Sequence, residues 1–164
     1  AQYLPAESSI HSREEMLDQI ATILGGRAAE QLLAGGPSTG AQDDFQKAHR
    51  IAEDLVTIYG MSDRLKYVRF AYNDYGMRCF SEATHRLIDV EIRRILAEQL
   101  QRATALLEER KEVTQRLAQA LCERETLTFL ELRAILGERP FPPKANFRRF
   151  LEELEPAQPV AQGA

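Results

Sequence analysis

SEATHRLIDVEIRRILAEQLQRATALLEER, residues 81–110, forms one long amphipathic segment of the 164-residue sequence. Its apolar residues recur three and four positions apart, which is the spacing of one face of an α-helix. They are Leu87, Ile88, Ile95, Leu96, Ala103, Leu106 and Leu107. Because a helix of this length needs partners along its whole apolar stripe, the segment predicts an all-α helical bundle built around one long helix.

Helical periodicity continues on the amino-terminal side of this segment. Ser12 and Glu15 have the spacing of a capping box, in which each side chain bonds the backbone of the other. The apolar stripe behind this box is Met16, Ile20, Ile23, Leu24, Ala28 and Leu32, and residues 35–37 (Gly-Gly-Pro) end the helix. Gly25 and Gly26 fall inside it, where each glycine costs about 1 kcal/mol relative to alanine. Close helix packing and a functional contact are both open as reasons for this pair.

A second helix is predicted to begin after Ser38 or Thr39, either of which can act as its N-cap. Its inner face is predicted to hold Phe45, Ala48, Ala52, Leu55 and Tyr59, and Gly60 ends it. Asp43 and Asp44 lie in its first turn, where the positive end of the helix dipole favours carboxylates. This acidic pair is the feature of the sequence that most resembles a site, although dipole complementation alone explains it.

Less regular sequence separates these helices from the long one, and further short helices follow it. Near residues 66–80 a short strand and an ordered loop both fit. After Arg110 the apolar pattern continues, either in the same helix with a bend or in a second helix. Thr128 and Glu131 make another capping box for a short helix that closes at Gly137.

The carboxyl-terminal residues differ in composition from the rest of the chain. Five of the seven prolines lie between Pro140 and Pro159. A small apolar stripe interrupts this region at Phe147, Phe150, Leu151 and Leu154. We therefore expect a helical domain over residues 1–137 and a Pro-rich docking tail over residues 138–164.

Composition excludes several classes of function. Lys and Arg number 21 against 25 Asp and Glu, with both signs interleaved, so we expect no nucleic-acid partner. No apolar run is long enough to span a bilayer, so we expect no membrane insertion by this chain. Cys79 and Cys122 are predicted to be buried thiols, and His11, His49 and His85 are predicted to be exposed and unligated.

Four blocks of sequence resemble a known family. They are LGGRAAE (24–30), STGAQDD (38–44), YGMSDRL (59–65) and SEATHRLID (81–89). In this order and spacing they resemble the peptidase domain of FtsH-type AAA zinc metalloproteases. Residues 1–5 and 136–141 look most like the mitochondrial matrix-facing (m-AAA) branch of that family.

The resemblance implies a zinc site to which this sequence contributes one residue. In the family, two histidines of a His-Glu-x-x-His helix and an aspartate at a later helix start bind zinc, with the motif glutamate as general base. Asp44 matches the aspartate, and the sequence contains no His-Glu-x-x-His. We therefore expect no catalytic residue and no cofactor in this chain alone, with Asp44 empty unless the site is complemented by zinc ligands from elsewhere.

Three functional hypotheses follow. The preferred one is a non-catalytic FtsH-like domain, a pseudoenzyme that serves as a structural or assembly subunit of a larger complex. The alternative is the carboxy-terminal half of an ATP-dependent zinc metalloprotease whose His-Glu-x-x-His helix and ATPase module come from another chain or a missing segment. The third is a free-standing helical interaction module.

The resemblance also implies partners and a location. The expected partners are protein subunits, in an FtsH-like ring or a mitochondrial membrane complex. The expected location is the matrix side of the mitochondrial inner membrane, with the bacterial cytoplasm or the chloroplast as alternatives.

Overall fold

The computed structural model describes residues 10–33, 35–36, 38–70, 80–138, 140–142 and 148. Across these ranges the regular structure is helical, with no strand, which confirms the all-α prediction. The elements in chain order are α1 (Arg13–Ile23), α2 (Gly25–Leu33), the 3-10 helix η1 (Thr39–Ala41), α3 (Gln42–Thr57), α4 (Glu82–Glu109), α5 (Lys111–Arg124) and α6 (Phe129–Leu136).

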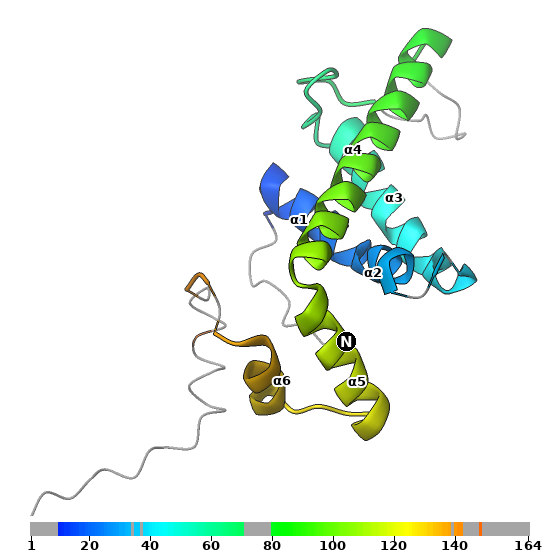
Figure 1. Ribbon diagram of the computed structural model, residues 1–164. Coiled ribbons are helices and arrows are strands. Elements are labelled where there is room, and N and C mark those ends of the chain that lie inside the picture. Colours follow the sequence, from blue (N-terminus) through cyan, green and yellow to red (C-terminus); the bar gives the residue numbers. More distant parts are fainter. Residues whose placement is uncertain are drawn as a thin grey trace, which may run out of the picture.

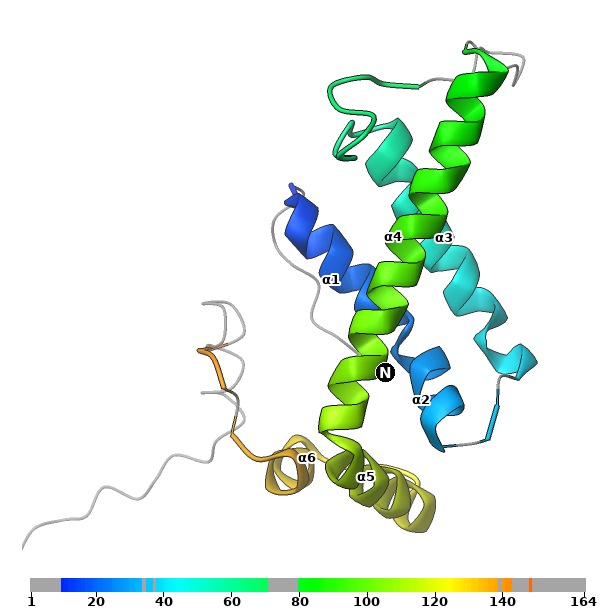
Figure 2. The same ribbon diagram turned by 45° about the horizontal axis from the view of Figure 1, so that its top comes forward.

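The 28-residue helix α4 is the longest element; α1, α2 and α3 pack against it, and α5 and α6 lie beyond its carboxyl end (Figures 1 and 2). Ser81 is its N-cap and accepts a hydrogen bond from the backbone N–H of Thr84 at 3.2 Å. The core between these helices is apolar. It contains Met16, Ile20, Leu24, Ala48, Ala52, Leu55, Val56, Ile88, Ile92 and Ile95.

The buried face of α4 differs in part from the predicted stripe. Ile88, Ile95 and Ala103 are buried as predicted, but Leu87 and Leu106 are 46% and 60% exposed. Phe45 and Tyr59 of the second predicted stripe are also exposed. The reason is geometric, because partners cover only one face of α4, and that face follows positions 88, 92, 95, 99 and 103.

Two helix boundaries, at Leu24 and at Arg110, decide between the arrangements considered from the sequence. The predicted helix through Gly25 and Gly26 is wrong, because α1 ends at Ile23 and the chain turns at the buried Leu24 before α2 begins. After α4 the chain turns at Arg110 (φ −107°, ψ 23°), so α5 is a second helix and not a bent continuation. Both predicted capping boxes, at Ser12 and at Thr128, are present.

Some predictions fall partly or wholly outside the described residues. Residues 66–70 are turn and irregular backbone, whereas 71–79, including Cys79, are not described, so the choice between strand and loop is settled only for 66–70. The apolar stripe of the tail also lies outside the described residues. Cys122 is exposed, so its predicted burial is wrong.

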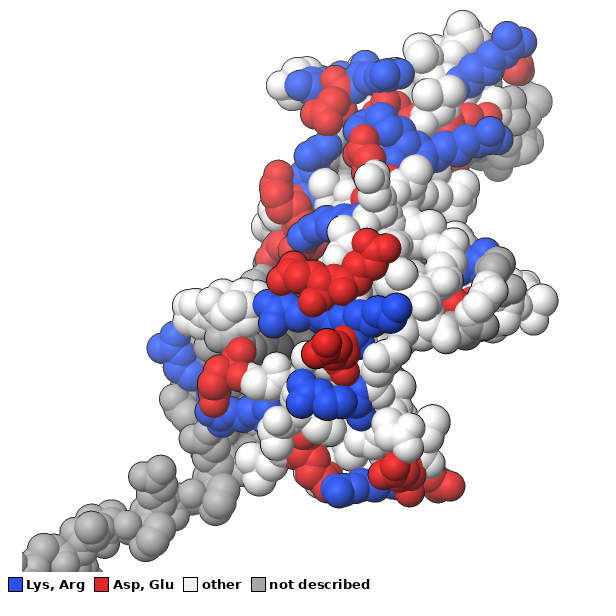
Figure 3. Space-filling model, viewed as in Figure 1, with Lys and Arg blue, Asp and Glu red and all other residues white. Residues whose placement is uncertain are grey.

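Two surface properties bear on function. Acidic and basic side chains alternate over the face in Figure 3. Among the described helices, none combines the length and the apolar character needed to cross a bilayer.

A buried carboxylate joins the loop after α3 to α4. The Glu91 side chain is fully buried, and its Oε2 accepts hydrogen bonds from Ser62 Oγ at 2.9 Å and from Arg94 Nη2 at 3.0 Å. Arg64 Nε lies 3.3 Å from Glu91 Oε1. Ser62 Oγ in turn accepts the backbone N–H groups of Arg64 and Leu65. The Glu91 carboxylate therefore holds the 62–65 turn against α4, directly through Ser62 and Arg64 and indirectly through the backbone groups that bond Ser62.

The surroundings of Glu91 fix its charge state. Burial alone would raise the pKa of the Glu91 carboxyl, but hydrogen bonds from Arg94 and Ser62 and the charges of Arg94 and Arg64 outweigh it, so this pKa lies below its ordinary value of 4.5. The carboxyl is therefore ionised at neutral pH. The negative charge stabilises this arrangement, because Ser62, Arg94 and Arg64 all direct N–H or O–H groups toward the carboxylate.

Substituting Glu91→Gln should lower the free energy of unfolding at pH 7 by about 2 kcal/mol, because the two arginines lose a buried, charged acceptor. The matched control is Glu98→Gln, which removes a second Arg94 partner that is 51% exposed. It should cost about 0.5 kcal/mol, as exposed ion pairs do. Urea denaturation followed by circular dichroism measures both, and equal losses would contradict the account.

The same carboxyl should give stability a pH dependence. Because its pKa is lower in the folded than in the unfolded chain, Glu91 contributes stability above about pH 4.5, and this contribution is lost as the pH falls through the folded pKa. Urea midpoints between pH 7 and pH 3 should fall less steeply below pH 4.5 in Glu91→Gln than in the unsubstituted chain. If the urea midpoints of the two proteins fall in parallel with pH, the Glu91 charge does not contribute to the pH dependence of stability.

Candidate functional site

The turn that leads into α3 is fastened to α2 by Glu30. The Glu30 carboxylate accepts the backbone N–H of Ser38 at 3.1 Å and the Ser38 hydroxyl at 2.5 Å. Ser38 Oγ also accepts the backbone N–H of Gly40 at 3.0 Å, which caps η1. The entry into α3 is therefore held by side chains on both sides of the turn.

Arg27 adds a second connection between α2 and this turn. Its guanidinium lies 3.5 Å from Glu30 Oε2, 3.5 Å from the Ser38 carbonyl oxygen, and 5.5 Å from the centroid of the Phe45 ring. Hydrogen bonds from the Ser38 side chain and backbone, helped by Arg27, lower the pKa of Glu30 against the opposing effect of burial. Glu30 is therefore an ionised acceptor whose bonds are all made within the turn.

This turn delivers Asp43 and Asp44 into the first turn of α3, as the sequence predicted. Asp43 is exposed and Asp44 is half-buried. Asp44 Oδ2 lies 3.7 Å from the position that a Cβ would take on Gly26, whereas nothing lies within 4 Å of such an atom on Gly25. Because 3.7 Å is an ordinary van der Waals distance, a Cβ would fit at either glycine, and the close approach expected from the glycine pair is not found. The group nearest to Gly26 is the Asp44 carboxylate.

Asp44 differs from Glu30 and Glu91 in its lack of partners, a property it shares among the described residues with the half-buried Glu53 and Asp54 of the same helix. Within the described part of the chain, it makes no hydrogen bond or ion pair, whereas Glu30 and Glu91 have all their bonds made. The positive end of α3 favours its negative charge without using its oxygen atoms. The carboxylate is consequently available as an oxygen ligand.

The three histidines do not join this carboxylate. Across residues 10–33, 35–36, 38–70, 80–138, 140–142 and 148 there is no group of three His, Cys, Asp or Glu side chains able to hold a metal ion. His49 is exposed as predicted, but His85 is half-buried, with its ring 6.2 Å from that of Phe80. His85 Nε2 lies 3.8 Å from Asp89 Oδ2, and its Nδ1 has no partner in the described part. The prediction of an exposed imidazole is wrong for His85 and also for His11, which is half-buried.

Sequence reasoning missed the two carboxylates that hold the fold around this site. Glu91 carries a usable signal, because it lies three residues after Ile88 and four before Ile95 on the apolar face of a helix. A charge at such a position needs buried partners. Glu30 has no comparable signal, since its partner Ser38 lies across a turn.

Comparison with known proteins gives a consistent result. The model of "Peptidase family M41" matches residues 1–135. The chain is 40% identical to "ATP-dependent zinc metalloprotease FtsH" of Rhodothermus marinus, over 100% of this chain and 25% of the relative. It is 37% identical to "Mitochondrial inner membrane m-AAA protease component AFG3L1" of Mus musculus, over 93% of this chain and 20% of the relative.

A plant relative extends the same pattern. The chain is 36% identical to "ATP-dependent zinc metalloprotease FTSH 10, mitochondrial" of Arabidopsis thaliana, over 99% of this chain and 20% of the relative. The chain thus spans a quarter or less of the length of these curated relatives.

Substituting Glu30→Ala should loosen the turn before α3, because Ser38 loses both of its bonds to the carboxylate. The backbone amides of Gly40 and Gln42 should exchange with solvent about tenfold faster, as expected for a loss of one to two hydrogen bonds. Hydrogen exchange followed by mass spectrometry or NMR measures this. The control is Gln31→Ala, an exposed neighbour on α2 that should leave both amides unchanged. Equal exchange in the two variants would contradict the role of Glu30.

Proposed function

The chain belongs to peptidase family M41, and from that premise we propose that it supplies Asp44 as the carboxylate ligand of a zinc peptidase site. The remaining ligands and the general base come from outside these 164 residues. The observation that supports this proposal is the half-buried Asp44 carboxylate, which has no partner among the described residues although the turn that delivers it is fully bonded.

The donor chemistry of this residue fits zinc. Carboxylate oxygen is a regular zinc ligand, and two imidazoles with one carboxylate leave a fourth position open. Zinc bound in such a site polarises a peptide carbonyl and lowers the pKa of a bound water. The names of two relatives, "ATP-dependent zinc metalloprotease", support this assignment.

The neighbouring residues have positioning roles in this proposal. Glu30 and Ser38 fix the η1 turn, so the first turn of α3 cannot shift relative to α2. Gly26 leaves the space beside Asp44 Oδ2 free of a side chain. The fixed turn reduces the conformational freedom that the Asp44 backbone would lose on binding a metal ion, and the absence of a side chain at Gly26 leaves room beside the carboxylate.

We place the activity in a multi-chain assembly. The name of the mouse relative, "m-AAA protease component", supports protein partners, and the relatives come from both bacteria and mitochondria. Mitochondrial and bacterial origins both agree with these relatives. A structural or assembly role without catalysis remains the competing hypothesis, and the experiment below separates the two.

Substituting Asp44→Asn should remove zinc and proteolysis together from the natural protein isolated through this chain. Losing one of three protein ligands should reduce casein cleavage at least a hundredfold, and metal analysis should show loss of stoichiometric zinc. Asp43→Asn is the matched control, because Asp43 is the exposed neighbour in the same helical turn, and it should retain zinc and activity.

Two outcomes would overturn the proposal. If the natural protein holds no zinc and cleaves no casein, the structural-subunit hypothesis is favoured. If it is active but Asp44→Asn and Asp43→Asn behave alike, Asp44 is not a ligand, and the zinc site lies elsewhere.

A further inference from the structure

Helices α5 and α6 form a hairpin at the end of α4, beyond α1, α2 and α3 (Figures 1 and 2). Neither helix contains a buried residue, in contrast to α1, α2, α3 and α4. Leu121, Leu130 and Leu136 are each at least 42% exposed. Short helices owe most of their stability to the burial of an apolar face, so this hairpin lacks a covering partner among the described residues.

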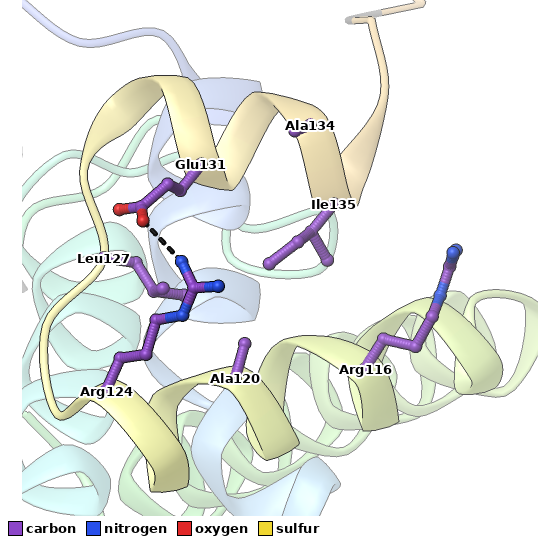
Figure 4. A pocket seen from close by; sticks show the side chains of 7 residues that line it. All are labelled: Arg116, Ala120, Arg124, Leu127, Glu131, Ala134 and Ile135. Carbon is purple, nitrogen blue, oxygen red and sulfur yellow. Dashed lines mark hydrogen bonds and ion pairs between the residues drawn. The ribbon is translucent and has the colours of Figure 1, made fainter.

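A shallow pocket of about 310 Å³ lies between the two helices (Figure 4). Its apolar lining is Ala120, Leu127, Ala134 and Ile135. At one end an ion pair of 2.6 Å joins Arg124 of α5 to Glu131 of α6. Farther along α5 lies Arg116, whose guanidinium has no carboxylate partner in the part of the chain that the structure describes.

We propose that the tail of this same chain covers the pocket, with Phe147, Phe150, Leu151 and Leu154 as one apolar helical face packed between α5 and α6. These four positions have the i, i+3, i+4, i+7 spacing of such a face. Arg148 falls off that face, and in the structure it has helical backbone and is exposed.

The dimensions match. Residues 116–124 of α5 span about 12 Å, and a helix over residues 147–154 spans about 10 Å. Residues 136–146 connect the pocket to the stripe and can reach roughly 35 Å when extended, which is ample for the chain to turn back.

Connectivity also favours the tail over another molecule. A segment joined by a short connection meets the pocket at an effective concentration in the millimolar range, which a separate chain does not reach without strong contacts. This proposal is independent of the zinc assignment, because it involves neither Asp44 nor α2.

The test is hydrogen exchange of the complete chain, with α1–α4 as an internal reference. In Phe150→Ser/Leu151→Ser, the amides of α5 and α6 should exchange at least tenfold faster, while those of α1–α4 should not change. Gln158→Ser, a polar substitution farther along the tail, is the matched control and should leave both regions unchanged.

A reciprocal variant tests the pocket from its other side. Ala120→Asp places a charge on the apolar floor and should release the tail, so trypsin should cleave after Arg148 or Arg149 at least tenfold faster than in the unsubstituted chain. Ala118→Asp, at an exposed position of the same helix, should leave cleavage unchanged.

The proposal is overturned if the tail substitutions leave α5 and α6 protected as before. It is also overturned if their protection rises with protein concentration and sedimentation shows a dimer, because a second copy then covers the hairpin.

Discussion

A single ionised carboxylate inside the helical core determines how the chain returns from α3 to α4. Glu91 has no exposed surface, and it bonds Ser62 on the turn and Arg94 on its own helix, with Arg64 at 3.3 Å. Because a buried charge without partners is strongly unfavourable, the 62–65 turn must close over it. That closure sets the path by which the chain leaves α3, and the cluster of α1, α3 and α4 side chains forms beside it.

The enclosed part of the structure does not extend to the end of α4. Its first part is enclosed by three helices, but after Ala103 no residue of α4, α5 or α6 is buried. Arg13 extends the ordered end, since it bonds the Met61 carbonyl oxygen and Asp63 on the same loop. The molecule therefore combines a tightly held four-helix part with a hairpin whose stability depends on what covers it.

Periodicity and capping chemistry account for what could be predicted from the sequence. The capping boxes at Ser12 and Thr128 depend on residues three apart, so local sequence was sufficient to predict them. The turn at Leu24 was not predictable from the apolar stripe, because the stripe is continuous across it. Exposure of Leu106 and burial of Glu91 depend on which helices lie opposite, which is tertiary information. Asp44 was found through family resemblance, since two acidic residues at a helix start have an ordinary structural explanation.

Three carboxylates in this chain differ in how their oxygen atoms are bonded. Glu91 and Glu30 each receive several hydrogen bonds, and both have lowered pKa values that report those bonds. Asp44 is half-buried like Glu30, yet no described group donates to it. A structural carboxylate gains stability by bonding all its oxygen atoms, whereas a ligand must keep one free for the metal. The helix end beside Asp44 favours its charge at no cost to that free oxygen, so this position can hold an unbonded carboxylate without the penalty that burial imposes on Glu91.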